Sequence, residues 1–201
     1  MRFPILAVRR LLAASVLVLA AGAAHALTVV PPTFDELVAK ANVVVRGVVT
    51  KVEAKTVETS QGTAIKTYVT FKVERTLKGT TEDEVTLQFL GGKVGRRTLK
   101  VVGMPTFSVG DREIVFVGDN GRVICPLIAA GHGRYRLETD PATKVEHVAR
   151  ENHAPLASTA EIAAPLDHST AALSSSAAMT REDFESRIIA AVSNSQTASQ
   201  K

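Results

Sequence analysis

Side chains alternate in character over thirteen residues, from Ile65 to Leu77, and this alternation sets the class of fold. A repeat of two is the period of a β-strand, whereas a helix repeats about every 3.6 residues, and the run is too long for chance. One face of the predicted strand carries Ile65, Thr67, Val69, Phe71, Val73 and Leu77, and the other carries Lys66, Tyr68, Thr70, Lys72, Glu74 and Thr76. We therefore expect a sheet with one face of this strand against the core.

Shorter strands are predicted on both sides of this one. Val43–Val52 is β-branched almost throughout, which suits a strand buried on both faces. The turn sequence Asp119-Asn120-Gly121 predicts a hairpin. Further strands are predicted at 85–89, 98–102, 113–117, 122–128 and 135–137. Because no helices alternate with these strands, we expect a mostly β fold, a small closed or nearly closed antiparallel barrel of about six strands.

A helix is expected at each end of this β region. Thr33 and Glu36 have the spacing of a capping box, and the helix that they start is expected to end near Ala41-Asn42. Thr180 and Asp183 mark the start of a second helix, whose apolar stripe is Phe184, Ile188, Ile189 and Val192. This helix either docks on the barrel or serves as a partner-binding or surface-attaching tail.

Composition divides the chain into parts. After Asp140 it shifts, and Ala154–Ala178 is rich in Ala, Ser, Thr and Pro and has no aromatic residue, which predicts a flexible linker. The predicted parts are a signal peptide (1–26), a barrel domain (27–140), a linker (141–178) and a C-terminal amphipathic helix with its tail (179–201).

The first 26 residues have the pattern of a secretory signal peptide. Three arginines precede an apolar run from Leu11 to Ala21, and Ala24-His25-Ala26 offers a cleavage site. We expect cleavage near Ala26 and export to the periplasm or the medium of a bacterium. The pair Arg9-Arg10 leaves both the Sec and the twin-arginine routes open. No later run approaches the roughly 20 apolar residues of a membrane span, so none is expected in the mature chain.

Removal of this segment changes the charge of the protein. The 24 Lys and Arg of the full chain become 21, against 20 Asp and Glu, so the net charge falls from +4 to +1. A nucleic-acid-binding protein needs clustered positive charge, which argues against that class. Cys125 is the single cysteine, so no intrachain disulfide forms, and the apolar segment Val123–Ile128 around it is expected to be core.

Three segments together resemble netrin-like modules, the family that includes the tissue inhibitors of metalloproteinases. Ala41–Val49 resembles their opening strand, and Ile65–Gly79 resembles their long second strand with its Lys-Gly end. Val109–Val117 is similar to a later strand with a glycine at its start. The resemblance covers about Thr33 to Glu138. It implies an oligonucleotide/oligosaccharide-binding-type (OB-type) barrel with flanking elements and a binding role, without catalysis.

The resemblance also implies a partner, an exported zinc metalloprotease. In the metalloproteinase inhibitors, an N-terminal cysteine places its amino group and carbonyl on the zinc of the protease. The mature terminus expected here has no cysteine, so that part of the mechanism does not transfer directly. The loop Gly91–Arg97 corresponds in position to a second element of the inhibitors' contact ridge. The partner-binding residues implied are Leu27, Thr28, Val29, Val30, Gly91, Gly92, Lys93, Arg96 and Arg97.

Other groups of chemically active residues do not form a recognisable site. Ser60 and Ser108 lack the surroundings of a nucleophile, and Glu82-Asp83-Glu84 has the character of a solvated strand entry. The four histidines of the expected mature chain, His132, His147, His153 and His168, lack the close spacing of a metal site. Gly91–Arg97 offers backbone amides and cations to an anion, or is simply a solvated hairpin. Arg122, Arg134 and Arg136 are expected on one exposed barrel face.

These observations predict a secreted, non-enzymatic binding module with no cofactor and no bound metal, which engages or inhibits an exported metalloprotease. An alternative is an envelope-associated scaffold that contacts its partners through the helix from Thr180 to Val192. A third is an enzyme without a familiar motif, because a fold does not by itself determine function.

Overall fold

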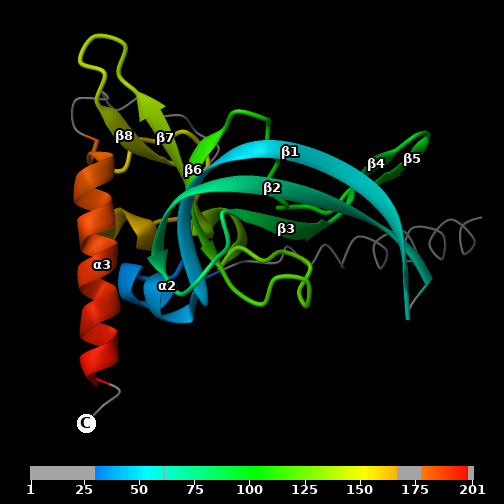
Figure 1. Ribbon diagram of the computed structural model, residues 1–201, viewed down its shortest axis with the longest axis horizontal. Helices are drawn as coiled ribbons and strands as arrows, with labels where there is room; N and C mark the ends of the chain where they lie inside the picture. The colour runs from blue at the N-terminus through cyan, green and yellow to red at the C-terminus, as the bar shows by residue number, and fades with distance from the viewer. Residues whose placement is uncertain (1–29, 61, 167–177, 199–201) are drawn as a thin grey trace, which may run out of the picture. The chain divides into compact units, whose positions relative to one another are not determined.

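A six-stranded antiparallel sheet forms most of the structure, a computed structural model that describes residues 30–60, 62–166 and 178–198 (Figure 1). The strands lie in the order β3-β2-β1-β6-β7-β8. Their bounds are β1 Val43–Thr59, β2 Gly62–Lys78, β3 Glu84–Leu90, β6 Arg112–Val117, β7 Arg134–Thr139 and β8 Glu146–Arg150. A separate hairpin consists of β4 (Gly92–Val94) and β5 (Arg97–Leu99). The predicted mostly β, antiparallel fold is confirmed, and within the described residues no strand pairing joins β3 to β8.

Strands β1 and β2 form a long ribbon that arches over the rest of the sheet (Figure 1). Each has seventeen residues, and they pair from Val44 with Lys78 to Thr59 with Gly62. The register shifts three times within this ladder, and such irregularities bend and twist a strand. Gly47 lies at one shift, where a Cβ atom would be 2.5 Å from the carbonyl oxygen of Lys72. The bend therefore depends on a residue without a side chain.

The sheet has an apolar cluster on each face. Successive residues alternate between the two clusters: Val44 and Phe116 belong to the first, and Val45 and Val117 belong to the second. Burial of Val44, Val45 and Val49 confirms the prediction that this strand is covered on both faces. The first cluster is closed by the helices α2 (Phe34–Lys40) and α3 (Arg181–Ala198), and the second by the loop before β6.

The capping box predicted for α2 is present. The Glu36 backbone N–H donates to Thr33 Oγ1 over 3.2 Å, and the Thr33 backbone N–H donates to Glu36 Oε2 over 2.9 Å. At the other end, Lys78 Nζ donates to the carbonyl oxygens of Val38 and Ala39, so β2 provides a cation for the last turn of the helix. Both ends of α2 are therefore fixed by side chains.

Replacement of the capping residue is expected to have a modest effect. Thr33→Ala removes the acceptor of the Glu36 N–H and should lower the free energy of unfolding by about 1 kcal/mol. Thr33→Ser keeps the hydroxyl and should lose much less. Equilibrium urea unfolding of both variants measures this difference, and equal losses would show that the hydroxyl is not the cause.

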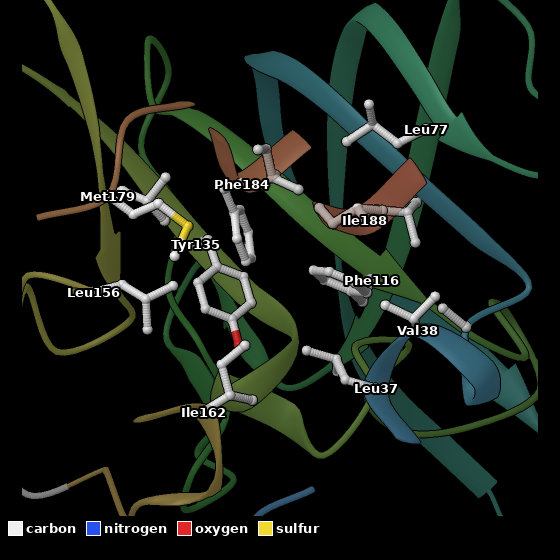
Figure 2. Packing of buried hydrophobic residues seen from close by; sticks show 14 of the residues in the cluster. Leu37, Val38, Leu77, Phe116, Tyr135, Leu156, Ile162, Met179, Phe184 and Ile188 are labelled. Carbon is white, nitrogen blue, oxygen red and sulfur yellow. The ribbon is translucent and has the colours of Figure 1, made fainter. Parts of the chain in front are cut away.

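The helix α3 docks on the sheet, which agrees with the first of the two interpretations of this segment. The Asp183 N–H donates to Thr180 Oγ1 over 3.2 Å, which confirms the predicted cap. Phe184 and Ile188 are completely buried, whereas Ile189, which was assigned to the same stripe, is 38% exposed. Figure 2 shows the Phe184 ring beside Tyr135 and close to Phe116. The ring centroids of Phe184 and Tyr135 are 4.8 Å apart.

The structure differs from the predicted linker at residues 141–178. Strand β8 lies within it and pairs with β7, and a 3₁₀ helix, η2 (Thr159–Ala163), follows. Leu156 and Ile162 are fully buried in the first cluster. The composition wrongly predicted a flexible linker, because a few buried apolar side chains are enough to hold an alanine- and proline-rich segment against a core. Residues 167–177 of the predicted linker lie outside the described residues, as do the whole predicted signal peptide and 199–201.

The segment after β6 also departs from expectation. A turn forms at Asp119–Gly121. The prediction of a returning strand at Arg122–Ile128 is wrong, because within this segment only Leu127 pairs, in an isolated bridge with Val117. Val123 and Ile124, predicted as core, are exposed, and Cys125 is partly buried against the second cluster. Burial raises the pKa of the Cys125 thiol, which keeps it protonated and unreactive.

Candidate functional site

An apolar cavity of about 350 Å³ lies between the β4–β5 hairpin and the second cluster. Its walls come from β1, β2, β3, the hairpin and the loop that precedes β6. The apolar lining residues are Val52, Val69, Phe89, Leu90, Leu99, Val101, Met104, Pro105 and Phe107. Pockets that bind small molecules have volumes of roughly 300–1,000 Å³ and are lined mainly by such side chains. The size and lining of this cavity are therefore those of a binding site.

Three aromatic rings fix one wall of the cavity. The ring of Phe107 meets that of Phe89 at 5.1 Å and that of Phe71 edge-on at 5.8 Å. Phe71 and Phe89 are buried in β2 and β3, so the loop residue Phe107 is held by the sheet. Edge-to-face and tilted contacts of this kind stabilise beyond the area that they bury.

The other face of Phe107 contacts a buried cation. The guanidinium carbon of Arg134 lies 4.1 Å from the centre of the Phe107 ring. Arg134 Nη1 donates to the carbonyl oxygen of Thr106 over 2.7 Å, and Nε donates to both carboxylate oxygens of Glu113. Both Arg134 and Glu113 have fully buried side chains. The cavity loop is thus attached to β6 and β7 through one arginine.

Glu113 has an unusual environment for a carboxylate. Burial raises its pKa, and the nearby Asp111 acts in the same direction, while Arg134 and Arg136 oppose the rise. Arg134 Nη2 also contacts Asp111 Oδ2 at 3.2 Å and Arg134 Nη1 lies 3.6 Å from Glu151 Oε1, so three carboxylates share its charge. The cluster is structural, because its polar atoms face one another and the loop backbone.

The hairpin above the cavity contains the three cations among the partner-binding residues implied by the sequence. Lys93 pairs with Thr98 in the β4–β5 ladder, and Arg96 and Arg97 follow the turn at Gly95. The predicted solvated hairpin is confirmed. Lys93, Arg96 and Arg97 are exposed, and within the described residues their side chains make no ion pair or hydrogen bond.

Gly91 and Gly92 belong to the cavity itself. Both line it, and both have positive φ values, +106° and +131°. A Cβ atom on Gly92 would lie 2.5 Å from Thr67 Oγ1, which shows how closely the hairpin approaches β2. Of the N-terminal candidates, Leu27, Thr28 and Val29 lie outside the described residues and Val30 is exposed, so the structure does not test whether they join the hairpin.

The prediction that Arg122, Arg134 and Arg136 lie on one exposed face is wrong. Arg134 is fully buried and the Arg136 side chain is 18% exposed, whereas Arg122 is exposed. The alternation of β7 places Arg134 toward the second cluster, where Glu113 neutralises it. No signal in the sequence identified this pair, because neither residue lies in a motif.

The remaining candidates show no grouping suited to chemistry. His147 Nδ1 contacts the carbonyl oxygen of Ala178, His153 contacts Glu138 at 3.0 Å, and His168 lies outside the described residues. Among the residues that the structure describes, no three His, Cys, Asp or Glu side chains gather closely enough to hold a metal ion. Ser60, Ser108 and the carboxylates at 82–84 are exposed.

A second polar network attaches α3 to the sheet. The Glu185 carboxylate, 2% exposed, accepts hydrogen bonds of 2.6 Å from Arg46 and from Arg75. Arg46 and Arg112 both pair with Glu74, and their charges keep the pKa of Glu74 below its usual range although burial acts to raise it. This network fixes the position of the helix.

The sequence matches no family model and no curated protein, and the structure matches no solved structure. Over the described ranges, no helix combines the length and the apolar character needed to cross a membrane. The geometry of the cavity and of the hairpin above it therefore provides the basis for a function.

Proposed function

We propose that this protein is an exported, non-enzymatic binding module that engages a protein partner through the β4–β5 hairpin. The observation that carries the proposal is the group of exposed cations at Lys93, Arg96 and Arg97, which have no partner among the described residues. Unpaired charges on a protruding hairpin are available to an acidic surface and increase the rate of association with it.

The resemblance to netrin-like modules suggests the kind of partner and the finer architecture. We propose that the antiparallel sheet and α2 belong to an OB-type, netrin-like barrel, and that the partner is an exported zinc metalloprotease. The expected N-terminal segment at 27–32 would supply a second contact. Cleavage near Ala26 would release the protein into the periplasm or the medium.

The alternative scaffold function would use a different surface. Phe184 and Ile188 are buried against the sheet, and Glu185 is held by two arginines. A partner that contacts α3 would therefore meet its outward, mainly polar side. No feature of that side favours a specific partner, so the hairpin supports the stronger proposal.

The test is a pull-down from the exported fraction with the mature protein as bait, followed by an inhibition assay on any zinc metalloprotease that is recovered. The variant Lys93→Ala/Arg96→Ala/Arg97→Ala should bind that protease roughly tenfold or more weakly, mainly through slower association. Lys40→Ala/Lys72→Ala/Arg122→Ala removes three other exposed cations and serves as the matched control.

Two results would contradict the proposal. One is unchanged protease binding by the triple variant when the segment before Thr33 is also removed. The other is an absence of any metalloprotease from the captured proteins, which would leave the netrin-like resemblance as a statement about fold alone.

A further inference from the structure

We propose that the cavity beneath the β4–β5 hairpin binds a fatty acid of medium length, with its chain among the apolar side chains and its carboxylate at Lys100. This inference goes beyond the proposed protein–protein contact, because it concerns a small ligand and the inside of the cavity. It depends on three observations: the lining, the rigidity of the walls and the charge at the rim.

The lining suits an alkyl chain. Val69, Phe89 and Phe107 form the apolar interior, and Leu99 and Met104 add flexible aliphatic groups. The described lining includes no carboxylate. If each methylene group takes about the ~30 Å³ that a water molecule occupies, 350 Å³ accommodates on the order of ten such groups. A long polar ligand would leave its hydrogen-bonding groups unpaired there.

The walls are fixed separately, so the cavity does not depend on a ligand to stay open. Phe107 is held by Phe71, Phe89 and Arg134. The hairpin is attached to β2, since the Gly91 N–H donates to the Ile65 carbonyl over 2.8 Å and Thr67 Oγ1 donates to the Gly91 carbonyl over 2.8 Å. Binding to a preformed site requires little ordering of the protein.

The charge at the rim selects an anion. Lys100 lines the cavity and is exposed, and it forms no ion pair within the described residues. A carboxylate at the end of an alkyl chain would pair with the Lys100 ammonium group while the chain stays in the cavity. A cationic head group would be repelled.

Isothermal titration calorimetry with sodium decanoate, below its micelle concentration, tests the proposal on the purified exported protein. We expect saturable binding of one decanoate per chain, and no binding of decyltrimethylammonium, which has the same chain and the opposite charge. Binding that does not saturate, or equal binding of the cationic amphiphile, would overturn the proposal.

Two variants locate the site. Val52→Trp places a large ring in the cavity from a rim position that is 38% exposed, and it should abolish decanoate binding. Lys100→Glu leaves the cavity open and should weaken decanoate binding at least tenfold, whereas Lys72→Glu, at an exposed position that does not line the cavity, should not. Unchanged thermal unfolding of each variant shows that it is folded. If Val52→Trp and Lys100→Glu both bound decanoate as tightly as the unaltered protein does, the ligand would lie elsewhere and the inference would be refuted.

This experiment is separate from the test of protein binding. Decanoate titration does not involve the metalloprotease, and the pull-down does not involve a fatty acid. Failure of either proposal therefore leaves the other to be judged by its own measurement.

Discussion

Arg134→Met should lower the free energy of unfolding by about 3–5 kcal/mol, because it leaves the buried carboxylate of Glu113 without its main partner. The substitution also removes the hydrogen bond to the Thr106 carbonyl and the contact with the Phe107 ring. Equilibrium unfolding in urea, followed by circular dichroism, gives the measurement.

Two further variants separate the cost of an unpaired charge from a general loss of packing. The double variant Glu113→Leu/Arg134→Met removes both charges and should recover most of the lost stability. Arg136→Met removes a more exposed arginine, whose Nη1 lies 3.8 Å from Glu113 Oε1, and should cost much less. If the double variant were as unstable as Arg134→Met, the buried charge would not be the cause.

The stability of Arg134→Met should also depend on pH in a defined direction. Without Arg134, burial raises the pKa of Glu113 further above its ordinary value of 4.5, since the main opposing charge is gone. The folded variant then holds the Glu113 proton more strongly than the unfolded chain does. The contribution of Glu113 to the stability of this variant is therefore greatest below pH 4.5 and declines as the pH rises through the folded-state pKa. Urea midpoints across this range, relative to Glu113→Leu/Arg134→Met at each pH, check the sign.

Phe184→Ala should destabilise the fold by about 3–5 kcal/mol, because it leaves a cavity where α3 meets the sheet. The Phe184 ring lies among Phe34, Phe116 and Tyr135, with ring centroids 4.8 to 6.4 Å away. Figure 2 shows Phe184 with Tyr135 and Phe116 in the first cluster. Chemical denaturation again provides the measurement.

Ile189→Ala is the matched control for Phe184→Ala. Ile189 lies five residues further along the same helix and is 38% exposed, so its truncation should cost well under half as much. Similar losses for the two variants would mean that α3 does not dock in the observed orientation. The same reasoning predicts that deletion of all residues after Ala178 unfolds the domain, so partner binding through α3 is better tested with substitutions on its exposed side.

The sequence by itself determined the elements whose cause is local. The alternation from Ile65 to Leu77 requires a strand, because only a period of two places these apolar side chains on one face. The β-branched run from Val43 required a strand covered on both sides, and the Thr33 and Thr180 caps marked both helix starts. The glycines at positions 91, 92 and 95 predicted the hairpin at Gly91–Arg97. Each of these patterns involves residues that are close together in the sequence, so it can be recognised without knowledge of the fold.

The tertiary structure decided the features that depend on residues far apart in the chain. Glu113 and Arg134 are separated by twenty-one positions, and only the pairing of β6 with β7 brings their charges together in the interior. The cavity likewise needs the arch of β1 and β2 and the loop at Phe107. Residues 146–166 pack against the core because Leu156 and Ile162 are buried in an apolar cluster formed by strands that are distant in the sequence. Composition alone does not predict this packing.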